Sequence, residues 1–226
     1  MNQDQDGAAQ HPASAYYSAQ YAARQPKDLT ALGILAFATA ALATASTCLT
    51  ASVLGRAVRI RAEQGRDAYD WSLGLYYAGE LLTSLSLLAG FVTGSMWLHR
   101  ARRNAEVMEP SGVHRRRAGW AWGGWVTPVV ALWFPFQVVR DVRRALTPLS
   151  TAGLVGFWWT LFLVSEVLAW NSQNLQSAAF AQLQYVELAR VASIVGAAVT
   201  IAALVGWGQV LRAVTLEQHQ RMYAGR

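Results

Sequence analysis

The sequence has few charged residues and a single cysteine. Only 14% of its 226 residues are charged, whereas an ordinary soluble domain has about 25%. This shortage argues against a soluble protein. Cys48 has no second cysteine to pair with, so an intramolecular disulfide is excluded. The motifs of zinc sites, phosphate-binding loops and serine hydrolases are absent from the sequence as well. We therefore expect no catalytic residues, no metal site and no cofactor.

Long apolar runs are what the sequence does contain. Hydrophobic residues make up 54% of the chain and form four runs, at 29–54, 71–98, 152–170 and 185–211. A helix needs about 20 apolar residues to cross a bilayer, and only a helix satisfies its own backbone hydrogen bonds there. We predict an all-α integral membrane protein, a four-transmembrane-helix bundle over 28–222. The polar residues 1–27 are predicted to form a disordered tail.

The distribution of basic residues predicts the orientation. With four spans both termini share one side, and 14 of the 19 basic residues fall on that side. Lys and Arg favour the cytoplasmic side, so we expect a multi-pass protein of the cell membrane with both termini in the cytoplasm. The net charge of +6 is then a property of the inner face, and no nucleic-acid-binding module is recognisable. Nucleic acid is not an expected partner.

The segment 119–146, between the second and third apolar runs, is rich in tryptophan and is interrupted by Pro128 and Pro135. Proline breaks helices, and a crossing segment would place Arg140, Arg143 and Arg144 outside the cell. We therefore expect a re-entrant or interfacial element that returns to the side it started from and ends in a short amphipathic helix.

The runs LHRARRNAEVM and GWAWGGWVTPVVALWFPFQVVRDVRRA resemble a bacterial, mostly actinobacterial, membrane protein family catalogued as domain of unknown function 4328. The resemblance implies a four-helix membrane fold and no particular activity. The sequence departs from the family at Ala131, where Asn is usual. The residues to which the resemblance gives a structural role are Trp97, Asn104, Trp120, Trp125, Pro128, Trp133, Pro135 and Gln137.

Four charged residues lie within or near the apolar runs: Glu80, Glu166, Glu187 and Arg190. An acidic residue inside a span costs about 2.5 kcal/mol or more and usually faces other helices or a cavity. We expect a polar cluster between the helices. It would serve either an ion path or polar-ligand pocket, or act as an ion-paired link that fixes the helix register.

Arginines flank the segment 119–146 on both sides. Juxtamembrane basic residues attract anionic lipids by about 1 kcal/mol each, so we expect anionic-lipid contacts, as plain anchoring or as a regulated event. The candidates are Arg100, Arg103, Arg115, Arg116, Arg117, Arg140, Arg143 and Arg144.

Three functions fit these features. The favoured one is a non-enzymatic membrane scaffold, subunit or adaptor that binds lipid or a protein partner. The second is a small oligomeric transporter or channel with Glu80 in its path. The third is a lipid-modifying enzyme that uses Asn104, His114 or Asp141 near the inner interface. A protein partner or a homo-oligomer is compatible with the first two.

Overall fold

The computed structural model describes residues 25–64, 70–110, 114–147 and 153–224. Most of the predicted tail, residues 1–24, lies outside these ranges. Four long helices make up most of the described chain: α2 (Thr30–Gln64), α3 (Asp70–Met108), α6 (Gly153–Ala181) and α7 (Val186–Ala224). Each contains a stretch that is long and apolar enough to cross a membrane. This confirms the predicted four-helix membrane fold.

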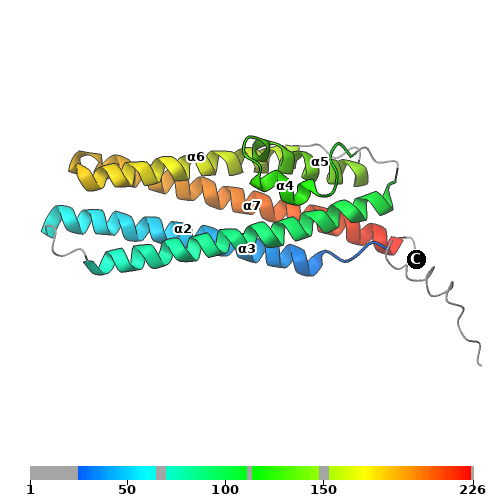
Figure 1. Ribbon diagram of the computed structural model, residues 1–226, viewed down its shortest axis with the longest axis horizontal. Coiled ribbons are helices and arrows are strands. Elements are labelled where there is room, and N and C mark those ends of the chain that lie inside the picture. The colour runs from blue at the N-terminus through cyan, green and yellow to red at the C-terminus, as the bar shows by residue number, and fades with distance from the viewer. Residues whose placement is uncertain (1–24, 65–69, 111–113, 148–152, 225–226) are drawn as a thin grey trace, which may run out of the picture.

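The helices form two antiparallel pairs, α2 with α3 and α6 with α7, and α2 also packs on α7 (Figure 1). The start of α2 and the end of α7 lie at one end of the bundle, which we call the terminal end. At the opposite end α2 gives way to α3, and α6 to α7 through the short helix η3 (Leu183–Tyr185). We call it the hairpin end because each pair of long helices is joined there.

Apolar side chains occupy every face of these helices, as expected for helices that face lipid. Leu35, Leu85, Val164 and Ile201 are all exposed. At the start of α2, the backbone N–H and the hydroxyl of Thr30 donate to the Asp28 carboxylate at 3.1 and 2.8 Å. These bonds hold the pKa of Asp28 below its ordinary value and satisfy a helix N–H that has no partner within the helix.

The segment between α3 and α6 folds as two short helices and a tight turn: α4 (Trp120–Val126), η2 (Val130–Leu132) and α5 (Phe134–Leu146). Pro128 follows the end of α4, and Pro135 lies in the first turn of α5, where proline is tolerated. Both prolines therefore lie at helix boundaries, and the seven residues of α4 are far too few to cross a bilayer.

This segment, the α4–α5 hairpin, is inserted between α3 and α6 at the terminal end (Figure 1). Trp122 of α4 packs edge-on against Phe91 of α3, with ring centroids 5.9 Å apart, and Phe91 lies about 25 Å along α3 from its end. The chain then returns, so that Arg143 of α5 pairs with Glu217 near the end of α7. The hairpin thus separates α3 from α6 and begins and ends at the terminal end.

Candidate functional site

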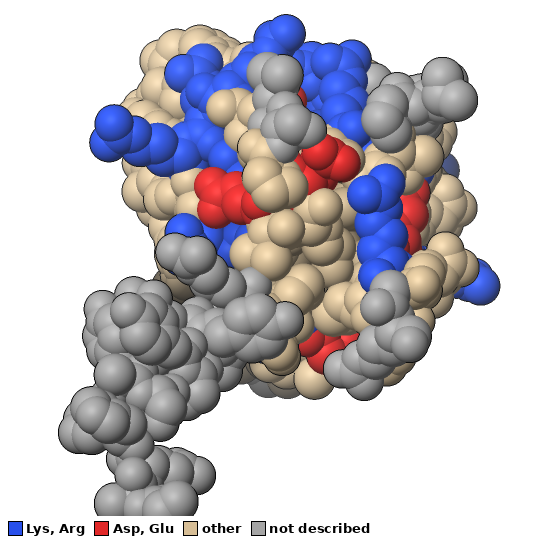
Figure 2. All heavy atoms as spheres, turned by 90° about the vertical axis from the view of Figure 1, so that its right-hand side faces the viewer, with Lys and Arg blue, Asp and Glu red and all other residues tan. Residues whose placement is uncertain are grey.

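The terminal end carries most of the charged groups of the described chain. Figure 2 shows this face, where Lys and Arg side chains gather along its upper part around a smaller group of acidic ones. The α4–α5 hairpin and the end of α3 supply most of these arginines. They fall into two groups, one held by other residues of the protein and one directed outward.

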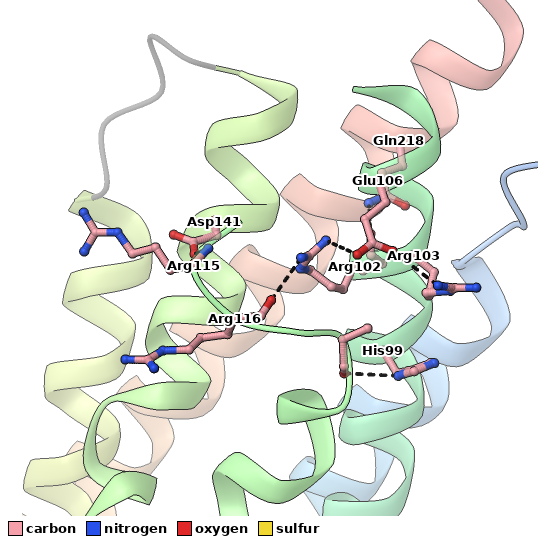
Figure 3. A network of polar contacts seen from close by, with 10 residues as sticks. His99, Arg102, Arg103, Glu106, Arg115, Arg116, Asp141 and Gln218 are labelled. Carbon is pink, nitrogen blue, oxygen red and sulfur yellow. Dashed lines mark hydrogen bonds and ion pairs between the residues drawn. The ribbon is translucent and has the colours of Figure 1, made fainter. Parts of the chain in front are cut away.

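The held arginines fix the loop before α4 to α3 (Figure 3). Arg102 of α3 forms an ion pair with Glu106 at 3.0 Å and donates to the backbone carbonyl of Arg116 at 3.0 Å. The Nε of Arg116 donates to Gln137 at 3.1 Å, and its guanidinium lies 3.8 Å from the centre of the Phe134 ring. Arg116 and Gln137 of the predicted set therefore join the loop to α5.

Asp141 of α5 is a buried acidic residue at this end. Its carboxylate accepts the backbone N–H of Arg115 at 3.0 Å and lies 3.8 Å from Nε of Arg140. His114, one residue before Arg115, has both ring nitrogens buried without a hydrogen bond to any described residue. Burial, followed by the charge of Arg102, lowers the pKa of His114.

Arg115, Arg140 and Arg144 form a cationic group that the protein does not neutralise fully. Burial, then the charges of Arg144 and Arg115, lower the pKa of Arg140, and Asp141 opposes them. Within the described chain, neither Nε nor one terminal nitrogen of Arg140 has a hydrogen-bond acceptor. Arg115 and Arg144 are exposed and form no ion pair with a described residue. We call these three residues the arginine triad.

The other candidate lipid contacts are placed differently. Arg143 forms an ion pair with Glu217 at 3.2 Å, and Arg100 donates to the backbone carbonyl of Asp28 at 3.4 Å. Arg103 is exposed and lies 3.5 Å from Glu106, and Arg117 is exposed. The arginines that sequence reasoning grouped together therefore divide into internal and outward-facing ones.

Asn104 and Gln218 connect α3, α7 and the segment before α2 at the terminal end. Asn104 of α3 donates to the side-chain oxygen of Gln218 on α7 at 2.8 Å and to the Lys27 carbonyl at 2.6 Å. Its own oxygen accepts the Lys27 backbone N–H at 2.9 Å. Gln218 in turn donates to the Ala101 carbonyl at 2.8 Å. Both side chains are buried, so Asn104 occupies a structural position between α3, α7 and the segment that precedes α2.

The tryptophans of the predicted set surround the same core. Trp97 is fully buried and donates to the Thr215 hydroxyl at 3.4 Å, and Trp120 packs on Phe134 with ring centroids 4.6 Å apart. Trp133 is exposed at the start of α5. Trp125, at the tip of α4, contacts Trp159 and Phe162 of α6.

A cavity of about 620 Å³ lies among the four long helices, beyond the tip of the hairpin. Trp125, Trp158, Phe162 and Trp207 line it on the side of the terminal end, and Gln176 and Ser193 line it towards the hairpin end. We call this space the span cavity. The hairpin and the cavity together occupy the region that separates α3 from α6.

The structure divides the four charged residues that sequence analysis grouped. Glu80 of α3 and Glu166 of α6 both line the span cavity. Glu187 and Arg190, at the start of α7, pair with each other at 2.8 Å, and both are exposed. The pair does not line the cavity.

A polar group that sequence reasoning missed crosses from α6 to α7 at the wall of the cavity. Gln176 donates to the hydroxyls of Ser172 and Ser193 at 3.1 and 2.6 Å, and the two hydroxyls are 2.9 Å apart. Ser172 and Gln176 are spaced four residues apart, so they share a helix face. That spacing was the available signal, but the partner on α7 was not visible in the sequence.

Comparison with known proteins identifies the family of the chain. No curated protein and no solved structure matches the chain. The model of a family described as a domain of unknown function, DUF4328, matches residues 61–216. This range contains α3, the α4–α5 hairpin, α6 and most of α7, and with them the buried Trp97 and Asn104. The chain is therefore a member of the DUF4328 family.

Proposed function

We propose that the protein is a non-enzymatic membrane adaptor that binds anionic lipid headgroups at its terminal end, and that this end faces the cytoplasm. The observation that carries the proposal is the arginine triad. Arg115, Arg140 and Arg144 bring three positive charges together beside one carboxylate. Guanidinium groups bind phosphate oxygens through paired hydrogen bonds, so the exposed Arg115 and Arg144 can bind a lipid phosphate, and the largely buried Arg140 adds its charge.

The orientation is supported by the same charges. Basic residues near the ends of spans are retained on the cytoplasmic side. Figure 2 shows many Lys and Arg side chains gathered on the terminal end, and most basic residues of the described chain belong to the segments at this end. The inner leaflet is also the one that is rich in anionic lipids. A cytoplasmic terminal end therefore places the triad against its proposed ligand.

Native mass spectrometry of the full chain, released from membranes of mixed phosphatidylcholine and phosphatidylglycerol, tests this proposal. The wild type should retain phosphatidylglycerol in preference to phosphatidylcholine. Combined substitution of Arg115→Gln, Arg140→Gln and Arg144→Gln should reduce this preference, because each juxtamembrane charge contributes about 1 kcal/mol. The matched control replaces Arg56, Arg59 and Arg190 with Gln near the hairpin end and should keep the preference.

The same spectra also examine the other functions. An unchanged lipid preference in the triad variant would refute the lipid site. A lipid of altered mass that appears with the folded protein and not with heat-denatured protein would refute the non-enzymatic assignment. A defined homo-oligomer without retained lipid would favour transport instead.

Transport is a second candidate because Glu80 lines the span cavity. We rank it lower because Trp125, Trp158 and Trp207 line the cavity on its path to the terminal end. Cation flux into liposomes that contain the protein, abolished by Glu80→Gln, would move transport to first place.

A further inference from the structure

The span cavity is a second site, separate from the arginine triad. Its lining extends along α2 from Ala36 to Leu54, a distance of about 27 Å along the helix. This nearly equals the hydrocarbon thickness of a bilayer, about 30 Å. Its volume of about 620 Å³ is within the range of roughly 300–1,000 Å³ that is usual for small-molecule sites.

The lining is open towards the surroundings of the bundle on one side. Leu87 of α3 and Trp170 of α6 both line the cavity and are both exposed, and α3 and α6 belong to different packed pairs. Since both residues lie in apolar spans, a ligand would enter from the lipid phase between these two helices.

The charge of the lining is acidic and unbalanced. Glu80 and Glu166 are its two charged residues, and the lining contains no Lys, Arg or His. Neither carboxylate forms an ion pair with a residue of the described chain. A carboxylate at membrane depth normally has a partner, and the described lining supplies no cationic side chain for either of them.

Two further observations point to a ligand. Oγ1 of Thr83, one helical turn from Glu80, and Oγ of the fully buried Ser95 have no hydrogen-bond partner among the described residues, and both residues line the cavity. Aromatic rings line it as well, and the faces of such rings attract cations. The aromatic lining residues are Tyr76, Phe91, Trp125, Trp158, Phe162, Trp170 and Trp207.

We propose that the span cavity binds a lipophilic organic cation, an apolar molecule that carries a single positive charge, with Glu80 and Glu166 as its counter-ions. A neutral acyl chain carries no positive charge and would leave both carboxylates without a counter-ion. An inorganic ion such as Ca²⁺ needs six to eight oxygen ligands, and the described residues contain no group of three or more His, Cys, Asp or Glu side chains that would hold one. An organic cation uses both the carboxylates and the apolar surface.

Binding of tetraphenylphosphonium to the purified full chain in phosphatidylcholine nanodiscs tests this proposal. Tetraphenylborate serves as the matched probe, since it has nearly the same size and shape and the opposite charge. We expect tetraphenylphosphonium to bind at least about tenfold more tightly than tetraphenylborate, beyond the difference measured with empty nanodiscs. Glu80→Gln and Glu166→Gln should each weaken tetraphenylphosphonium binding by about tenfold, which corresponds to 1.4 kcal/mol.

Glu187→Gln is the control variant, because Glu187 is an acidic residue outside the cavity and its loss should leave the affinity unchanged. The Gln variants should fold, since a neutral amide costs less than a carboxylate within a span, and far-ultraviolet circular dichroism checks this. Equal binding of the two probes, or wild-type affinity in both Glu80→Gln and Glu166→Gln, would overturn the proposal. The triad variant should bind tetraphenylphosphonium normally, so this site and the lipid site can fail independently.

Discussion

At the scale of single residues, Trp125 and Trp159 pack edge to face with ring centroids 6.0 Å apart, but their indole N–H groups differ. The N–H of Trp159 donates to the Leu132 carbonyl at 2.8 Å and thereby joins α6 to the hairpin. The N–H of Trp125 is buried without a partner among the described residues. The hairpin is therefore held to α6 by one directional bond and by ring packing.

Substitution of each tryptophan by phenylalanine separates these two contributions. Both variants lose the same part of the indole ring, so the difference between them reflects the hydrogen bond of Trp159 together with its greater burial. Trp159→Phe should cost about 1–3 kcal/mol more than Trp125→Phe, because it leaves the Leu132 carbonyl without its donor. The free energy of unfolding in detergent micelles, followed by circular dichroism, measures this difference. Equal losses would mean that the bond contributes nothing.

His114 predicts how stability depends on pH. Burial beside Arg102 holds its pKa in the folded state below the ordinary value of about 6.5. At pH values between the folded and the unfolded pKa, the unfolded chain therefore binds more protons than the folded one. Stability from the neutral ring is then present above about pH 6.5 and is lost as the pH falls. His114→Gln should lose less stability than the wild type between about pH 7.5 and pH 5. Identical losses in the two proteins would contradict a buried neutral imidazole.

At the scale of elements, the turn between α4 and α5 is the strained part of the hairpin. Val129 has φ 63°, a backbone conformation that costs a β-branched residue energy, and the Val130 N–H donates to the Pro128 carbonyl at 2.6 Å. A three-residue turn of this hand is rare and strained. The turn at Val129 reverses the chain shortly after α4 ends. It therefore sets how far the hairpin reaches towards the span cavity.

Val129→Gly should therefore stabilise the protein. Strain of about 1–3 kcal/mol is relieved, and about 0.4–1 kcal/mol of this is offset by the freedom that glycine gains in the unfolded chain. Val167→Gly is the control, because Val167 is 60% exposed against 66% for Val129 but lies inside α6. It should lower stability by about 0.5–1 kcal/mol. Thermal melting in micelles shows whether each variant gains or loses stability. A loss of stability in both variants would contradict the strain at Val129.

The helices also show which features of the fold the sequence could predict. The four apolar runs and the breaks at Pro128 and Pro135 were predictable, because helix length and proline geometry are local properties. The ends of the helices were not. α3 continues to Met108, since Arg102 and Glu106 pair one turn apart and extend the helix beyond its apolar part. Apolar length indicates the membrane-spanning part of a helix and not the whole helix.

At the scale of the whole molecule, long-range contacts decide the site. Asn104 and Gln218 are 114 residues apart, and no spacing rule connects them. Glu80 and Glu166 were recognisable as charges within spans, but their shared cavity arises because the α4–α5 hairpin lies between α3 and α6. Glu187 and Arg190 pair within one helix, as their spacing of three residues permits. The pairing within one helix could be predicted from the sequence, whereas the span cavity could be found only from the packing of the helices.

The central claim is that the α4–α5 hairpin enters between α3 and α6 and returns to the terminal end, and our proposal adds that this end faces the cytoplasm. Single cysteines placed on a Cys48→Ala background and labelled with a charged, membrane-impermeant maleimide test it directly. Pro110 precedes the α4–α5 hairpin and Arg144 lies in its last helical turn. Gln64 and Gln182 lie at the opposite end of the bundle, the hairpin end, and all four residues are exposed.

We predict that cysteines at Gln64 and Gln182 are labelled in intact cells. Cysteines at Pro110 and Arg144 should both be labelled only after permeabilisation. Labelling of Pro110 and Arg144 from opposite sides would show that the segment crosses the membrane and would contradict the hairpin.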